Sequence, residues 1–110
     1  PVAVGSAWID QQMVSDSDEF LSLVERYSCA RAILWGHVHQ ALDRHHGDIR
    51  LLSSPSACIQ FAVARDEFKG DDPAPGYRWL DLYPDGRIDT GVSRVTGVTF
   101  NVELDSSGYL

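Results

Sequence analysis

The residues best suited to chemistry in this chain are two histidines, His37 and His39, placed two positions apart. They follow the apolar run 32–35 and a glycine, Gly36. Neutral imidazoles are common ligands for zinc, manganese and iron, and a turn after a strand can aim both rings into one space. We therefore interpret His37 and His39 as candidate metal ligands, with Gly36 permitting the tight backbone turn between strand and site.

The His-x-His spacing alone leaves alternatives open. Two solvated or hydrogen-bonded loop histidines have the same pattern. His45 and His46 could extend the pair to a small zinc-binding module of four histidines. Their neighbours, Gly47 and Asp48, instead favour an exposed hairpin turn over residues 43–48.

The elements around the histidines predict a helix followed by a buried strand. Apolar residues recur at helical spacing from Phe20 to Tyr27, and Asp16 with Glu19 has the spacing of a capping box, so we expect a helix over 16–27. The unalternating run 30–35 is typical of a strand buried on both faces in a parallel sheet. Ligands gather beyond the carboxyl ends of such strands, which is where both histidines lie.

Beyond the histidines the pattern changes to β structure. The turn Pro84-Asp85-Gly86, between an alternating run and an apolar one, predicts a hairpin. The expected fold class is α/β, more narrowly an α+β fragment, with one helix, one buried strand and a mostly antiparallel sheet ending in a C-terminal hairpin. Residues 1–95 form the folded segment and 96–110 a tail. The expected strands cover 49–52, 56–64, 77–83 and 87–95, with a surface loop at 66–76.

The composition of the chain limits which partners it could bind and in which cellular compartment it is expected. The 110 residues carry a formal net charge of −7 and no basic patch, which argues against binding a nucleic acid polymer or an anionic membrane. No apolar stretch has the length of a membrane span. Cys29 and Cys58 are far apart, and Cys58 lies in an apolar run as an expected core residue. We interpret this usage as that of a reducing, cytoplasmic protein.

The segment Gly36-His37-Val38-His39 resembles the Gly-His-x-His signature of the calcineurin-like metallophosphoesterases. Three longer segments and the Gly108-Tyr109 ending extend the likeness over nearly the whole chain, to the C-terminal part of the bacterial class III 3′,5′-cyclic AMP phosphodiesterases. The segments are RAILWGHVHQ, LLSSPSACIQF and DDPAPGYRWLDLYPDGRIDTGVSRV.

The resemblance implies a β-sandwich hydrolase with two divalent metal ions, often iron and manganese, acting on cyclic AMP or a related phosphodiester. It implies that His37 ligates one metal and His39 the other. The family's remaining metal motifs and its catalytic histidine lie in its N-terminal half, and Pro1 resembles the end of its His-His-Pro segment. No catalytic residue is therefore assigned here, and this chain alone is expected to bind metal weakly or not at all and to be inactive.

Two further expectations concern partners. One sheet of a sandwich has an uncovered apolar face, which predicts self-association or pairing with a missing N-terminal half. The alternative function is a non-catalytic interaction or oligomerisation module that retains the scaffold.

Overall fold

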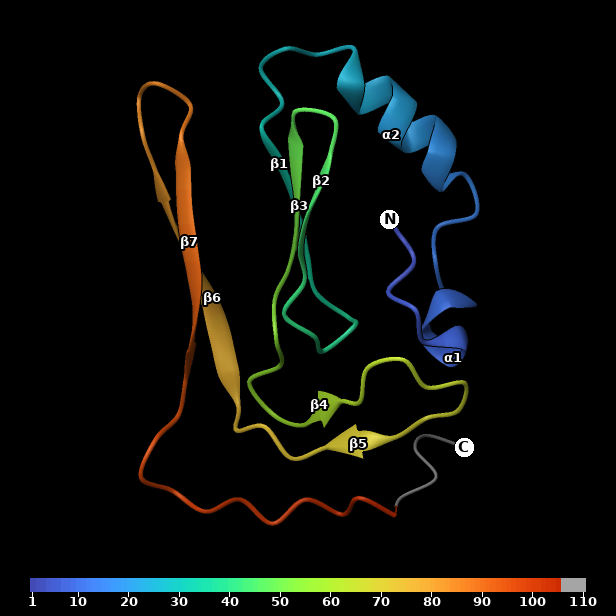
Figure 1. The fold of residues 1–110 in the computed structure, drawn as a ribbon, viewed down its shortest axis with the longest axis vertical. Helices are drawn as coiled ribbons and strands as arrows, with labels where there is room; N and C mark the ends of the chain where they lie inside the picture. The colour runs from blue at the N-terminus through green and yellow to red at the C-terminus, as the bar shows by residue number, and fades with distance from the viewer. Residues whose placement is uncertain (106–110) are drawn as a thin grey trace.

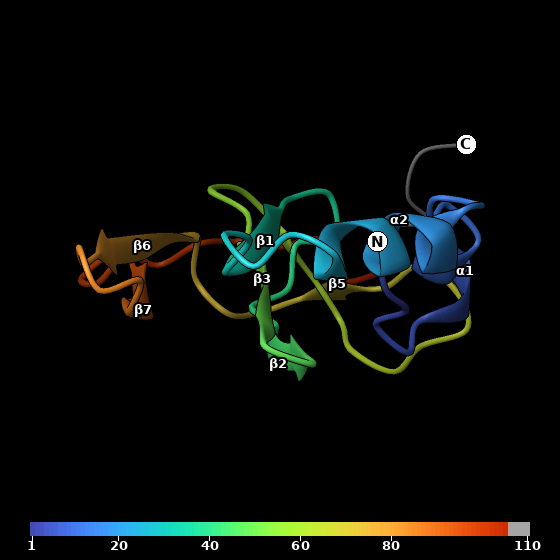
Figure 2. The same ribbon diagram turned by 90° about the horizontal axis from the view of Figure 1, so that it is seen from above.

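The computed structural model describes residues 1–105 of the chain, which form a flat body with the central sheet between the C-terminal hairpin and the helices (Figures 1 and 2). Its extents are 44 × 34 × 17 Å (Figures 1 and 2). The radius of gyration is 15.5 Å, against about 13 Å for a compact domain of this length. The structure is α+β, as the sequence predicts, but the described residues form two helices where one was expected, because 7–10 make a further short helix. The elements are α1 (Ala7–Asp10), α2 (Ser17–Glu25), β1 (Ala32–Trp35), β2 (Asp43–His46), β3 (Ile49–Ser53), β4 (Gln60–Phe61), β5 (Gly70–Asp71), β6 (Gly76–Leu82) and β7 (Ile88–Arg94).

The central sheet has the order β1-β3-β2, with β3 in the middle. β1 is parallel to β3 in the register Ala32↔Arg50 to Trp35↔Ser53. β2 is antiparallel to β3. The core lies along β3, where Ile49, Leu51 and Leu52 are almost fully buried. Burial of these side chains is the main local source of stability.

Two predictions about this sheet are wrong. Residues 43–46 form strand β2 rather than a turn, and only Gly47 and Asp48 make the turn, with Gly47 at φ 55°. β2 is stabilised by Arg50, which donates Nε and Nη2 to Asp43 at 2.9 and 2.7 Å. This hydrogen bonding is the main reason that the pKa of Asp43 is lowered.

The second wrong prediction is that β1 is buried on both faces. Its Leu34 is 51% exposed, and its other residues are only partly buried. β1 lies at an edge of the sheet, and in Figure 2 it is at the upper margin of the flat body, above β3. The apolar run 32–35 predicts a buried strand, but residues 1–105 do not bury Leu34.

The N-terminal residues form two helices and an aromatic cluster. α2 confirms the expected helix, two residues shorter at its C-terminal end, and Asp16 occupies the N-cap position. The expected capping box is wrong, because Asp16 makes no side-chain hydrogen bond to the helix. Trp8 of α1 packs edge-on against Phe61 and Phe68, with ring centroids 5.0 and 5.1 Å away. This contact joins α1 to β4.

The expected strand over 56–64 is reduced to β4, two residues long. Local hydrogen bonds from the Gln60 side chain explain the loss: its Oε1 accepts from the Ser56 N–H at 3.1 Å and its Nε2 donates to the Ser56 carbonyl at 2.8 Å. Such bonds compete with a strand ladder. Cys58 lies in this loop and is exposed, so its assignment to the core is wrong.

The β6–β7 hairpin confirms the clearest sequence prediction. It pairs from Gly76↔Arg94 to Leu82↔Ile88, and Gly86 adopts φ 85° in its turn. Arg78 attaches the hairpin to the central sheet. Its Nε donates to the Ser53 carbonyl at 2.9 Å and its Nη2 to the Leu42 carbonyl at 3.0 Å.

Residues 95–105 run back across the end of the flat body without regular structure (Figure 1). Lys69 approaches Asp105 at 3.6 Å, and the placement of a boundary at residue 95 stays a prediction. The Gly108-Tyr109 ending lies outside the described residues. Within those residues, both helices are too short to cross a lipid bilayer.

Replacing Arg78 with Met is expected to lower the free energy of unfolding by about 1–3 kcal/mol, because the Ser53 carbonyl loses its charged donor. The matched control is Arg87→Met on the same hairpin. Arg87 is 53% exposed where it pairs with Asp89, and its loss is expected to cost less than about 1 kcal/mol. Urea unfolding measures both, and equal effects would contradict a docking role for Arg78.

Candidate metal centre

The two histidines lie in a left-handed turn directly after β1. The Val38 N–H donates to the Gly36 carbonyl at 2.8 Å, so His37, at φ 70°, is the central residue of a γ-turn. His39 follows at φ 50°. Residues with a Cβ rarely adopt this left-handed region of φ and ψ, and a γ-turn of positive φ is strained. Such strain is concentrated at functional sites.

Gly36 has a different role from the expected one. Its φ is outside the left-handed region, and a Cβ added to it would meet nothing within 4 Å. The unusual backbone is at His37 and His39 instead. The prediction that the glycine makes the turn possible is therefore wrong, because the histidines adopt the turn themselves.

The His39 ring is held against the core by Phe61. The two rings are stacked, with centroids 4.0 Å apart and planes at 12°. His39 Nδ1 is buried and has no hydrogen-bond partner within residues 1–105. A buried nitrogen without a partner is costly, and a ligand from outside these residues would remove that cost.

The electrostatics favour neutral His39. Burial is the largest cause lowering its pKa, the charge on nearby His37 lowers it further, and the backbone of Ile59 opposes the change. The neutral imidazole is the form that binds a metal. The orphaned nitrogen and the lowered pKa together make His39 a fitting metal ligand.

His37 differs from His39 in its surroundings. It is exposed, and it borders a cavity of about 290 Å³. Trp35, Val38 and residues of the N-terminal segment complete the lining. The turn thus separates the pair into one ring packed on the core and one ring open to solvent.

The structure does not bring His45 and His46 to this turn. His46 is paired with Ile49, at the end of β3 opposite to Ser53, the residue beside Trp35. Its Nε2 lies 3.2 Å from Glu25 Oε1. Across residues 1–105, no three His, Cys, Asp or Glu side chains are grouped to hold a metal ion. The geometry therefore speaks against a four-histidine zinc module.

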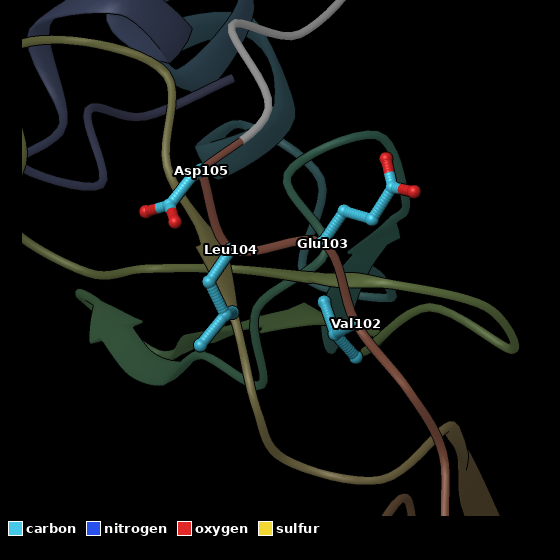
Figure 3. Close-up of a pocket in the computed structure, with 4 residues that line it drawn as sticks. All are labelled: Val102, Glu103, Leu104 and Asp105. Atoms are coloured by element: carbon cyan, nitrogen blue, oxygen red, sulfur yellow. The ribbon is translucent and has the colours of Figure 1, made fainter.

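A larger cavity, of about 560 Å³, lies along the C-terminal segment and has no functional character. Val102, Glu103, Leu104 and Asp105 line it. Figure 3 shows the carboxylates of Glu103 and Asp105 pointing in different directions, away from each other. Nothing there converges on a common ligand.

Sequence reasoning missed two residues that shape the turn. Phe61 supplies the stacking surface for His39, and Ser53 is completely buried beside the turn. Phe61 gives no sequence signal because its contact depends on chain packing. Ser53 does give one, because it is a polar residue directly after Leu51 and Leu52 at the end of β3.

Comparison with known proteins relates the chain to bacterial phosphodiesterases. It is 48% identical over 109 residues to the 3′,5′-cyclic adenosine monophosphate phosphodiesterase CpdA of Pseudomonas aeruginosa. It is 41% identical over 109 residues to the CpdA of Vibrio vulnificus. It is 38% identical over 95 residues to a 3′,5′-cyclic-nucleotide phosphodiesterase of Nostoc. No model of a known protein family matches the chain.

The matches cover most of this chain but a minor part of each relative. For the Pseudomonas and Vibrio proteins they cover 99% of the chain and 40% of the relative. For the Nostoc protein the shares are 86% and 36%. These shares are consistent with the predicted C-terminal fragment and confirm the resemblance seen in the sequence. The chain is therefore homologous, over almost all of its length, to a part of the CpdA-type 3′,5′-cyclic AMP phosphodiesterases.

Proposed function

We propose that this chain is part of a dinuclear-metal phosphodiesterase that hydrolyses 3′,5′-cyclic AMP or a related phosphodiester. In this proposal His37 ligates one divalent ion and His39 the other, the ions being iron or manganese. The observation that carries it is the buried, unpartnered Nδ1 of His39 in a strained turn. The names of the relatives supply the substrate class.

The residues of the chain would prepare the ligands rather than perform the hydrolysis. Stacking on Phe61 fixes the plane of the His39 ring, and burial lowers its pKa, which favours the neutral form. The left-handed turn gives His37 and His39 different surroundings, as two separate ions require. Divalent ions in such a centre activate water and neutralise charge on the phosphoryl oxygens.

A metal titration tests the assignment of the two histidines. Mn²⁺ is expected to bind the 110-residue chain weakly and to broaden the side-chain NMR signals of His37 and His39. Because each ring is a ligand, His37→Ala and His39→Ala should each weaken binding about 10-fold or more.

The matched control is the double variant His45→Ala/His46→Ala, at the other end of the sheet, which should leave the broadening unchanged. Loss of binding in this variant, with retention in the other two, would favour the zinc-module alternative.

We also propose that the isolated chain is catalytically inactive. Among its described residues the turn brings together two histidines without a third metal-binding side chain, and an ion held this loosely is poorly placed to activate water. The 110-residue chain with Mn²⁺ or Fe²⁺ is therefore expected to hydrolyse no cyclic AMP above background.

The Pseudomonas relative, assayed under identical conditions, is the positive control for the hydrolysis measurement. Metal-dependent turnover that co-purifies with the 110-residue chain, free of any longer phosphodiesterase, would contradict the proposal of inactivity.

Exposed apolar side chains carry a proposal about partners. Leu34 on edge strand β1 and Leu23 on α2 are about half exposed, although the sequence has the apolar character of buried elements there. We propose that the rest of a longer phosphodiesterase covers the surface around these side chains, and that the isolated chain covers it by self-association. The same surface would serve the alternative function, a non-catalytic oligomerisation module, and the metal titration separates the two.

Analytical ultracentrifugation of the isolated chain is expected to show dimers or larger species. Leu34→Glu should shift them toward monomer, because it places a charge on the edge of the sheet. The matched control is Leu82→Glu on β6. Leu82 is 73% exposed, and its replacement should change association little. A monodisperse wild-type monomer would refute self-association.

A further inference from the structure

Ser53 follows Leu51 and Leu52 in β3, and its hydroxyl makes two hydrogen bonds. It is the last residue of β3, with no exposed surface. Its Oγ donates to the Gln40 carbonyl at 2.5 Å and accepts from the Leu42 N–H at 2.9 Å. Both partners belong to the segment that leaves the histidine turn.

The end of β3 also fixes the start of the turn. Trp35, the last residue of β1, pairs with Ser53, and its carbonyl accepts from the Ser54 N–H at 3.0 Å. The Ser53 N–H donates to the Leu42 carbonyl at 3.0 Å. Residues 36–42 therefore begin beside Ser53 and Ser54 and end on Ser53.

These hydrogen bonds offset the backbone strain in the histidine turn. His37 and His39 remain in the left-handed region only if the surrounding contacts outweigh the backbone cost. Gln40 follows His39 directly, so the bond from Ser53 acts one residue away from the strained position. Without the hydroxyl, the Leu42 N–H and the Gln40 carbonyl would lose buried partners, and another conformation of the turn would compete.

We infer that Ser53 is a positioning residue: its hydroxyl holds His39 in the left-handed conformation against Phe61 and thereby sets the affinity for a divalent ion. The effect on affinity rests on the proposed role of His39 as a ligand. The effect on conformation does not. Ser53 itself is buried, so it acts through the backbone of residues 40 and 42.

Two NMR measurements on the 110-residue chain test the inference. Stacking on Phe61 should give the His39 ring protons an upfield ring-current shift, and Mn²⁺ titration reports affinity. Ser53→Ala is expected to lose most of the upfield shift and to weaken Mn²⁺ binding about 10-fold, the usual effect of removing a support of a metal ligand.

Ile49→Val is the matched control, because it trims a buried residue at the other end of the same strand. It should reduce stability while leaving the His39 shift and the Mn²⁺ affinity unchanged. If Ser53→Ala does not fold, Ser53→Cys keeps the volume with a weaker hydrogen-bonding group, and it should reduce both readouts in part.

The outcomes separate the two proposals. A folded Ser53→Ala variant with the wild-type ring-current shift overturns the positioning role, and equal losses in Ile49→Val overturn it as well. If the wild-type chain shows no Mn²⁺ effect at His37 or His39 while Ser53→Ala still loses the ring-current shift, the metal assignment fails and the positioning of His39 by Ser53 stands.

Discussion

The structure depends on strand β3, to which each other part of the site is attached. β1 and β2 pair with its two edges, Ile49 and Leu51 belong to the hydrophobic core cluster, and Leu52 is fully buried. At its last residue it receives the hairpin through Arg78 and the histidine turn through the Ser53 hydroxyl. A five-residue strand can hold these segments in place because its buried backbone and hydroxyl groups form hydrogen bonds with them.

The histidine turn shows how a small structure can hold side chains in costly conformations. The left-handed backbone at His37 and His39 and the orphaned Nδ1 of His39 are both unfavourable by themselves. Stacking on Phe61 and the hydrogen bonds of Ser53 offset these costs in part. Conflict between local preference and native structure is expected at functional sites, and here it coincides with the motif that the sequence singles out.

The incomplete cover of edge strand β1 gives a second constraint. A sheet with a hydrophobic face needs another layer to bury it, and residues 1–105 supply only part of that cover. The exposure of Leu34 follows directly. The match covers 99% of this chain but 40% of the Pseudomonas relative. Most of that relative therefore lies outside the region that this chain matches.

The sequence by itself determined the elements whose signals are local. Helical spacing located α2, the Pro84-Asp85-Gly86 turn located the β6–β7 hairpin, and the run 32–35 followed by two histidines located the candidate site. In each case backbone preference and the tertiary structure agree, which is why periodicity and turn chemistry were sufficient.

Only the tertiary structure decided the features that depend on distant partners. Strand β2 replaced an expected turn because Arg50 of β3 holds Asp43, and the expected strand over 56–64 shrank because Gln60 bonds its own loop. The separation of His46 from His39 and the stacking of Phe61 likewise depend on strand register and packing. The residue types indicate which side chains are candidates for a site. Contacts between segments far apart in the chain decide which of these side chains lie close together.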